Sequence, residues 1–500
     1  MRTVIRGGWV VGYDGDSHTL IRNGVVVVED DRVHSIETSY DGRADVEIDA
    51  LDSLVSPGLI DTHVHPGTWE RDRSIADNGR KVIMGLPFQE HAICAPGTHA
   101  PGDYRYDGSE SNDKIVPDSV GALFTQVELL TNGITTFVDA GTRTKFQEMH
   151  VAVAEKLGLR AYLAPGFQST MNEGGENGKI VRDWDYESTR GNAEFDAAVE
   201  FIQNFDGVQD GRIRGMLYPR ETDFCSPEQL RRTREMADKL GVPIQTHASY
   251  SAQDFYFCVE QYGLTPIELL ADTGVLGPDT MIAHPLWIAE SDLTSWQEGR
   301  DLELLAESGT SVILCPITYA RRGWSFDVQQ YSEAGVNVVI GNDTFPRDII
   351  QNMRLASYNS KILRRSLFAS PAEAVFEAST INAANGLQRP DLGRLAPGAK
   401  ADIITVKLKP EGSLRWGVVY DPIKALVDVG IGDDVQTVLV DGIVRMKDRQ
   451  IADVDVREII ETSQTAAEAF WDNIQDWDAL GRTMEQKAPW SFPLRKERIG

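Results

Sequence analysis

The sequence predicts an α/β protein, built as a TIM-like (β/α)8 barrel with a second, smaller and discontinuous β-sandwich domain. In the central part of the chain, short apolar runs alternate with helical patterns, which is typical of parallel strands joined by helical crossovers. Eight such runs are present, and eight parallel strands are the number that closes this kind of barrel. Segments rich in strand-forming residues flank the centre at both ends, which indicates one sandwich assembled from both.

The β-rich flanks set the predicted domain boundaries. Residues 4–48 contain valine-rich runs separated by turn signals such as Asp14-Gly15 and Asn23-Gly24. Similar strand-like runs occur at residues 401–406 and 435–444. We therefore assign residues 1–55 and 396–450 to the sandwich and residues 56–395 to the barrel. Residues 451–500 are expected to form a C-terminal helix and an extended arm, with a role in packing or oligomer contact.

The barrel elements follow in order. The predicted strands are residues 56–65, 135–139, 160–164, 213–218, 243–247, 280–284, 311–315 and 337–343. Helices are expected at residues 120–130, 150–158, 193–205 and 227–240, the last with Ser226 as its N-cap. A stretch at about residues 67–120 is rich in Gly, Pro, Asp and Asn, and long segments of this kind are often lids or binding loops. It offers Trp69, Phe88 and His91 as candidate substrate contacts.

Charge and composition narrow the class of partner. The chain has 500 residues and a formal net charge of −27, a field that repels nucleic-acid backbones and anionic lipid surfaces. A small-molecule substrate, neutral or cationic rather than anionic, is therefore expected, in a protein that forms homo-oligomers. Because the chain lacks both the pattern of a signal peptide and an apolar stretch long enough to span a membrane, we expect a cytoplasmic protein. Its four cysteines show no Cys-x-x-Cys spacing, which argues against a disulfide framework or a cysteine zinc site.

Five polar residues at the ends of predicted strands carry the chemistry. His63 and His65 share one face of the first strand because side chains alternate with a period of two. His247, His284 and Asp343 end three later strands, and the carboxyl ends of barrel strands are where such enzymes place their active sites. Imidazoles with one carboxylate suit a divalent ion, with Zn²⁺ favoured over Fe, Mn or Co. A bound ion can lower the pKa of a coordinated water to about 7.

These residues, with the run Pro57-Gly58-Leu59-Ile60-Asp61-Thr62 before His63, the pair Asn342-Asp343 and the split β-domain closed by Asp441-Gly442, resemble the metal-dependent amidohydrolase superfamily. Within it, the chain is most similar to the branch that holds cytosine, guanine and S-adenosylhomocysteine deaminases and the triazine hydrolases. The resemblance spans about residues 1–450.

The resemblance implies a role for each strand-end residue. His63, His65, His247 and Asp343 correspond to the metal ligands, and Asp343 also takes a proton from the attacking water. His284 corresponds to a histidine that contacts the water or the substrate. Because the fourth strand has no lysine that could bridge two metals, one ion is favoured over two.

One departure from the family pattern bears on the reaction. The deaminases carry a glutamate three residues after the strand-five histidine, where it shuttles a proton to a ring nitrogen, whereas this chain has Tyr250 at that place. A tyrosine, with an ordinary pKa of about 10, is a poor substitute, and Asp254 stands further along. Tyr250 and, after the seventh strand, Arg321 remain candidate substrate contacts.

Three hypotheses follow. The first is a metal-dependent hydrolase in which activated water attacks a non-peptide C–N bond of amide, carbamate, urea or cyclic amidine type, with Asp343 and His284 as the catalytic pair. The second keeps the fold and makes the enzyme an aminohydrolase or a dechlorinating hydrolase of a nitrogen heterocycle. The third is a non-catalytic barrel scaffold, which the complete ligand set argues against.

Overall fold

The structure is a computed structural model that describes residues 1–66, 73, 95, 119–174, 180–294, 296, 298–409, 411 and 413–494. The predicted lid contacts Trp69, Phe88 and His91 lie outside the described residues. No helix in the described part of the chain is long and apolar enough to cross a membrane.

The eight predicted barrel strands are present, and they form two parallel four-stranded sheets. One sheet has the order β12-β8-β7-β6 and the other the order β14-β15-β16-β17. Their bounds are β6 (Leu59–Val64), β7 (Ile134–Asp139), β8 (Arg160–Leu163), β12 (Ile213–Gly215), β14 (Ile244–His247), β15 (Thr280–Ala283), β16 (Ser311–Leu314) and β17 (Asn337–Ile340). Every residue of β6, β7 and β14 is buried, as expected for strands covered on both faces.

Backbone pairing joins the two sheets at both edges, so the eight strands form a closed ring. A parallel bridge pairs Val64 with Asp343, next to hydrogen bonds from the His65 N–H to the Asp343 carbonyl and from the Asp343 N–H to the His63 carbonyl, both 2.8 Å. Gly341 permits this seam, because a Cβ there would lie 2.7 Å from the His63 Cβ. At the opposite seam Leu217 pairs with Ile244.

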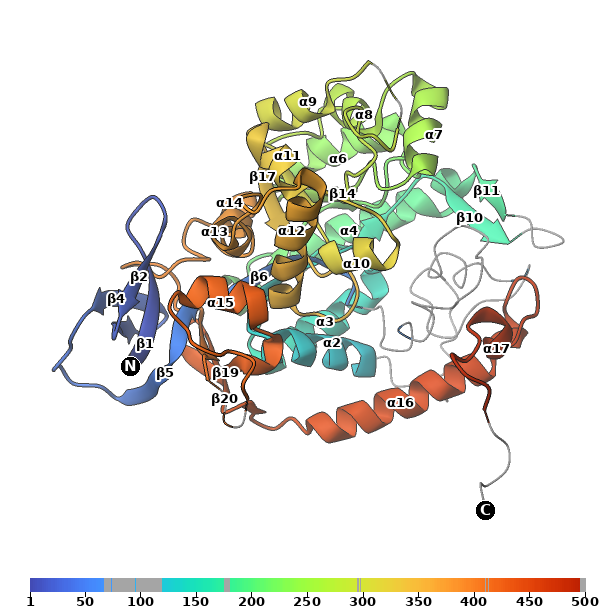
Figure 1. Cartoon of the computed structure of the whole chain (residues 1–500). Coiled ribbons are helices and arrows are strands. Elements are labelled where there is room, and N and C mark those ends of the chain that lie inside the picture. Colours follow the sequence, from blue (N-terminus) through green and yellow to red (C-terminus); the bar gives the residue numbers. More distant parts are fainter. Residues whose placement is uncertain are drawn as a thin grey trace.

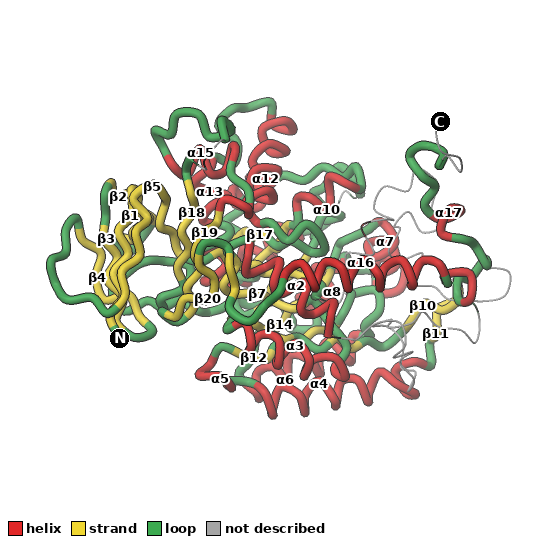
Figure 2. The backbone as a smooth tube through the Cα atoms, turned by 90° about the horizontal axis from the view of Figure 1, so that it is seen from below, coloured by secondary structure: helices red, strands yellow, loops and turns green. Residues whose placement is uncertain are grey.

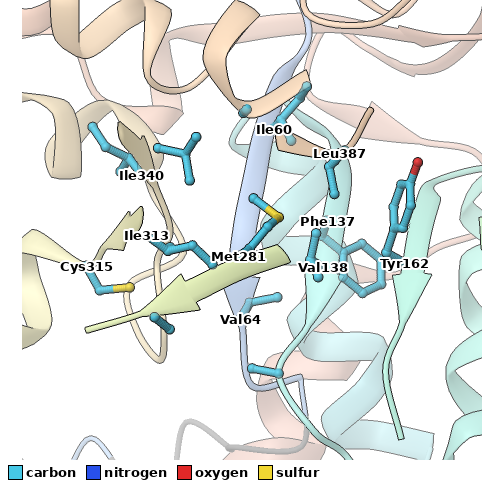
Figure 3. Packing of buried hydrophobic residues seen from close by; sticks show 14 of the residues in the cluster. Ile60, Val64, Phe137, Val138, Tyr162, Met281, Ile313, Cys315, Ile340 and Leu387 are labelled. Atoms are coloured by element: carbon cyan, nitrogen blue, oxygen red, sulfur yellow. The ribbon is translucent and has the colours of Figure 1, made fainter. Parts of the chain in front are cut away.

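Helices surround the ring, and a single apolar core fills it (Figures 1 and 3). Ile60, Phe137, Met281 and Ile340 come from four different strands and lie in that core. The helices are α2 (Ser119–Thr131), α3 (Thr144–Leu157), α4 (Asn192–Phe205), α5 (Val208–Gly211), α6 (Pro227–Leu240), α7 (Ala252–Tyr262), α8 (Pro266–Asp272), α9 (Asp301–Ser308), α10 (Pro316–Arg321), α11 (Val328–Glu333), α12 (Ile349–Arg364), α13 (Ala372–Glu377), α14 (Ile381–Gly386), α15 (Pro422–Val429), α16 (Val456–Asp472) and α17 (Met484–Lys487). The Ser226 side chain accepts the Gln229 N–H, so the predicted N-cap of α6 is confirmed.

The β-rich flanks combine into one nine-stranded sheet at the side of the barrel (Figure 2). Its order is β21-β20-β19-β18-β5-β1-β3-β4, with β2 also paired to β1. The strands are β1 (Arg2–Tyr13), β2 (His18–Arg22), β3 (Val25–Glu29), β4 (Arg32–Glu37), β5 (Val46–Pro57), β18 (Ile403–Lys407), β19 (Val435–Val440), β20 (Ile443–Lys447) and β21 (Gln450–Ile451). Since β5 runs through Pro57 and β6 starts at Leu59, the sheet leads directly into the first barrel strand.

Shorter elements complete the chain. They are β9 (Gly166–Phe167), β10 (Met171–Gly174), β11 (Ile180–Asp183) and β13 (Tyr218–Pro219), a π-helical turn at Glu187–Gly191, and 3-10 turns at Gly432–Asp434 and Ile474–Asp476. The C-terminal helix α16 runs outward from the β-sheet along α2 (Figure 1). Its predicted helical character is confirmed.

A buried ion-pair cluster connects the barrel to the nine-stranded sheet. Arg160, the first residue of β8, donates to both carboxylate oxygens of Asp402 at 3.1 and 3.2 Å and to Asp441 at 2.8 Å. Arg160 is fully buried, and the side chains of Asp402 and Asp441 are only 4% and 7% exposed. Lys400 also reaches Asp441, at 3.0 Å. The cluster therefore fixes the two parts of the molecule to each other through largely buried charges.

Candidate metal centre

The five strand-end residues of the sequence hypothesis come together at the carboxyl ends of the barrel strands. His63 belongs to β6 and His65 follows it, while His247 ends β14, His284 follows β15 and Asp343 follows β17. The ligating atoms of His63, His65 and His247 lie within 4.8 Å of one another, and so do those of His63, His284 and Asp343. His63 belongs to both groups and stands at the centre of the arrangement.

Individual distances show how tightly the polar atoms converge. The Nε2 atoms of His63 and His247 are 3.2 Å apart. Asp343 Oδ1 lies 3.3 Å from His65 Nε2, 3.8 Å from His63 Nε2 and 3.9 Å from His284 Nε2. Two imidazole nitrogens with lone pairs facing each other repel unless a proton or a cation lies between them, so the arrangement suits a bound cation.

Burial sets the protonation states that a metal site needs. Desolvation lowers the pKa of His63 and His247 well below the ordinary value and lowers that of His284 to about 4. These imidazoles are therefore neutral at pH 7 and keep a lone pair for a ligand. Burial opposes ionisation of Asp343, but the hydrogen bond with His65 and the neighbouring histidines outweigh it and hold the pKa of this carboxyl well below its usual range. Neutral imidazole nitrogens and a carboxylate are donor types that Zn²⁺ sites in proteins use.

Hydrogen bonds to neighbouring side chains orient the imidazoles of His63 and His284. His63 Nδ1 lies 2.7 Å from Gln245 Oε1, and the Gln245 amide donates to the Thr62 carbonyl at 2.9 Å. Since the amide group is fixed as a donor by that carbonyl, its oxygen accepts the Nδ1 proton and directs Nε2 of His63 toward the site. His284 Nδ1 lies 2.8 Å from the Tyr319 hydroxyl, and burial raises the pKa of Tyr319.

We predict that replacing Gln245 by Leu weakens metal affinity by about ten- to a hundredfold, the usual effect of losing a partner that orients a ligating histidine. Leucine fills the space but cannot accept the Nδ1 proton of His63. Chelator competition on the purified protein measures the affinity. Gln245→Glu keeps an acceptor for Nδ1 but loses the hydrogen bond to the Thr62 carbonyl, so its metal affinity should lie between those of the wild type and Gln245→Leu. Equal affinities for the two variants would contradict this orienting role.

The backbone at two of the strand ends is in the left-handed region. His284 and Asp343 both have φ of 63°, which is uncommon for residues other than glycine. Hydrogen bonds hold both turns, from the His284 N–H to the Ile313 carbonyl at 3.1 Å and from the Asp343 N–H to the His63 carbonyl at 2.8 Å. Such conformations cost free energy and concentrate at functional sites, where the surrounding fold imposes them.

Sequence reasoning missed a buried carboxylate next to the centre. Asp61 accepts hydrogen bonds from the backbone and side chain of Asn342 at 3.0 and 2.7 Å, and Asn352 holds the Asn342 side chain in turn at 2.8 Å. Burial raises the pKa of Asp61 to about 7. The network fixes the turn that presents Asp343.

The position of Gln245 beside the centre could have been predicted from the sequence. Gln245 precedes His247 by two residues on the same strand, so the two side chains share one face.

Tyr250 and Arg321 have different surroundings. The Tyr250 hydroxyl donates to Asp223 Oδ1 at 3.3 Å, and Arg182 binds the other oxygen of Asp223 at 2.8 Å. Burial raises the pKa of Asp223 to about 6, against the effect of Arg182. Asp254 is buried and accepts from Thr222, not from any of the five strand-end residues. Arg321 is exposed and places its guanidinium 4.3 Å above the ring of Phe345.

Known proteins are similar to this chain in sequence and in fold. The Amidohydrolase family profile matches residues 54–444. The 5'-deoxyadenosine deaminase of Methanothermobacter thermautotrophicus is 30% identical over 454 residues, covering 89% of this chain and 95% of that protein. The enzyme of the same name from Methanosarcina barkeri is 28% identical over 470 residues, covering 93% and 97%.

Two solved structures have the same fold. An adenosine deaminase from Xanthomonas campestris with bound zinc has a TM-score of 0.75 at 19% identity, covering 94% of this chain and 98% of its own. An atrazine chlorohydrolase from Arthrobacter aurescens, complexed with zinc, has a TM-score of 0.76 at 21% identity, covering 93% and 100%.

Proposed function

The chain belongs to the amidohydrolase family, and from this premise we propose that it is a mononuclear zinc enzyme that releases an amine or ammonia from a nitrogen heterocycle. Its class is that of metal-dependent hydrolases acting on C–N bonds other than peptide bonds. The observation that carries the proposal is the convergence of four imidazoles and one carboxylate at the strand ends. We also expect a cytoplasmic homo-oligomer.

The donor set fits one ion held by His63, His65, His247 and Asp343, with Fe, Mn or Co as alternatives to zinc. When bound, the ion supplies Lewis acidity, which lowers the pKa of a coordinated water and makes it a nucleophile near neutral pH. Everything else that the reaction requires must come from the side chains around the centre.

Asp343 is proposed as the general base. Its low pKa keeps it ionised, and its Oδ1 lies within 3.9 Å of three imidazole nitrogens, so it stands where the nucleophile must lose its proton. His284, neutral and held by Tyr319, directs Nε2 toward the same region and orients the electrophile. Its left-handed backbone and the Tyr319 hydroxyl fix that direction before any substrate arrives.

Delivery of a proton to the leaving group must follow a different route from that of relatives with a glutamate after strand five. Tyr250 occupies that place here and is hydrogen-bonded to Asp223. Glu221 offers a second carboxylate nearby, with Oε1 3.6 Å from His247 Nδ1. The leaving group of an amidine-type C–N bond departs as an amine, so an acid must protonate it. Asp223 and Glu221, both from the segment after β13, are the carboxyl groups that we propose for this role.

A leaving-group panel tests the proposal. We expect zinc-loaded protein to release ammonia from at least one of adenosine, 5'-deoxyadenosine, 5'-methylthioadenosine and S-adenosylhomocysteine, or ammonia or an amine from an N-alkylated or carboxylate-bearing nitrogen heterocycle. Metal content near one ion per chain should accompany the activity. Chloride release from atrazine alone would favour the second candidate, a dechlorinating hydrolase. Chloride departs without a proton, so a tyrosine in place of the glutamate, at Tyr250, would not prevent its release. Protein purified without a stoichiometric metal would revive the scaffold hypothesis.

A further inference from the structure

Arg322 stands beside the proposed centre on a segment that is already tied to it. The residue follows β16 and the short helix α10, and its backbone N–H donates to the Tyr319 carbonyl at 3.0 Å. The Tyr319 side chain is the one that holds His284, at 2.8 Å. The guanidinium of Arg322 is therefore carried by the same turn that positions a residue of the centre.

The guanidinium has a stacking partner but no acceptor. Its Cζ lies 5.0 Å from the centroid of the Trp324 ring, which meets Trp287 edge-on with centroids 4.6 Å apart. Among the residues that the structure describes, none forms a hydrogen bond or an ion pair with the Arg322 side chain. Stacking occupies one face of a guanidinium and leaves the N–H groups of its plane available to a planar oxyanion.

Two other arginines, by contrast, share a carboxylate partner. Arg73 and Arg347 both bind Glu128, each at 2.8 Å. Arg322 is half-buried, and desolvation lowers its pKa, while Asp343 acts in the opposite direction. A desolvated cation without a hydrogen-bonded counter-ion is costly, so an anionic partner would bring a large gain.

The charges around the centre also favour an anionic ligand. A bound divalent ion would bring two positive charges to the centre, and Arg322 and Arg321 both interact electrostatically with Asp343. Against these cations stand the carboxylates of Asp343 and Glu221. The centre is thus locally positive in a chain whose formal net charge is −27. The overall charge favours neutral or cationic ligands, whereas the local charge favours an anion.

We propose that Arg322 binds a carboxylate of the substrate through a two-pronged hydrogen bond, so that the enzyme acts on heterocycles that carry a carboxylate near the scissile C–N bond. This inference rests on the proposed function and names its substrate class. It differs from the expectation of a neutral or cationic substrate, which rests on the net charge of the whole chain. Phosphate is another oxyanion that a guanidinium recognises, and their relative binding affinities distinguish the two.

Binding of matched pairs to zinc-loaded protein tests the inference without turnover. The probes are benzoate with benzamide, nicotinate with nicotinamide, and inorganic phosphate, measured by calorimetry and by the shift in Tm. We expect at least one carboxylate to bind more than tenfold tighter than its amide. Arg322→Gln should lower carboxylate affinity about ten- to a hundredfold and leave amide affinity unchanged. Arg322→Lys keeps the charge without the fork and should fall between.

The control is Arg321→Gln, which removes a neighbouring positive charge but not the proposed contact and should weaken carboxylate binding less than threefold. Equal loss in both arginine variants would show general attraction and overturn the inference. Carboxylate binding that persists in Arg322→Gln would show direct ligation of the metal and also overturn it, as would tighter binding of phosphate. An unaltered Tm of the unliganded variants shows that they fold. Failure of the leaving-group panel would instead refute the proposed function, since these binding measurements need no reaction.

Discussion

Replacing Asp343 by Asn is expected to reduce kcat by at least about a thousandfold while the fold stays intact. A general base contributes on the order of 10² to 10⁴ in rate, and this carboxylate is also a proposed ligand of the ion. Asparagine has nearly the same shape but cannot accept a proton and carries no charge. The backbone hydrogen bonds of residue 343, at 2.8 Å to both His63 and His65, do not depend on the side chain, so the barrel seam should survive.

The measurement combines turnover of the substrate found by the panel, metal content and Tm. Asp272→Asn is the matched control, because its side chain is 55% exposed on the surface and the same chemical change there should leave kcat within twofold. Activity above a tenth of the wild-type value in Asp343→Asn would refute the assignment of the base.

Replacing Arg160 by Met is expected to lower the free energy of unfolding by about 3–5 kcal/mol, the usual cost of removing one partner from a buried ion pair. Methionine fills much of the volume but leaves Asp402, whose side chain is 4% exposed, without the cation that is hydrogen-bonded to it. Asp441 keeps Lys400 and Arg212, at 3.0 and 3.4 Å, so the stranded charge is mainly that of Asp402.

Guanidinium denaturation gives the loss. Arg231→Met is the control, because Arg231 and its partner Asp272 are 48% and 55% exposed, and exposed pairs contribute about 0–1 kcal/mol. If the Arg160 variant lost no more stability than the control, the cluster would not be what holds the barrel and the nine-stranded sheet together.

The barrel could be predicted from the sequence because each strand is a short apolar run that ends at a polar residue. The period of two placed His63 and His65 on one side of β6, and strand ends that meet at one rim brought His247, His284 and Asp343 to them. Those arguments use local pattern and one rule of topology. The domain boundaries and the individual ligand roles stay predictions.

What the sequence could not supply were contacts between distant segments. Nothing near Arg160 signals that its partners lie at positions 402 and 441, and the link between Tyr250 and Asp223 joins two loops with unrelated patterns. The sequence offered Arg321 as a candidate substrate contact and did not single out Arg322, since only the packing of Arg322 on Trp324 and of Arg321 on Phe345 distinguishes the two side chains. Long-range pairing of charges depends on three-dimensional packing, which residue spacing does not encode.

The seam between β6 and the turn after β17 also sets an order of events during synthesis. Residues 63 and 65 leave the ribosome nearly 280 residues before Asp343, and a parallel bridge at Val64 seals the ring only when that late turn arrives. Until then the early histidines lack their carboxylate and cannot hold an ion with the full set. A chain cut short before residue 343 therefore has neither a closed barrel nor the complete set of five strand-end residues.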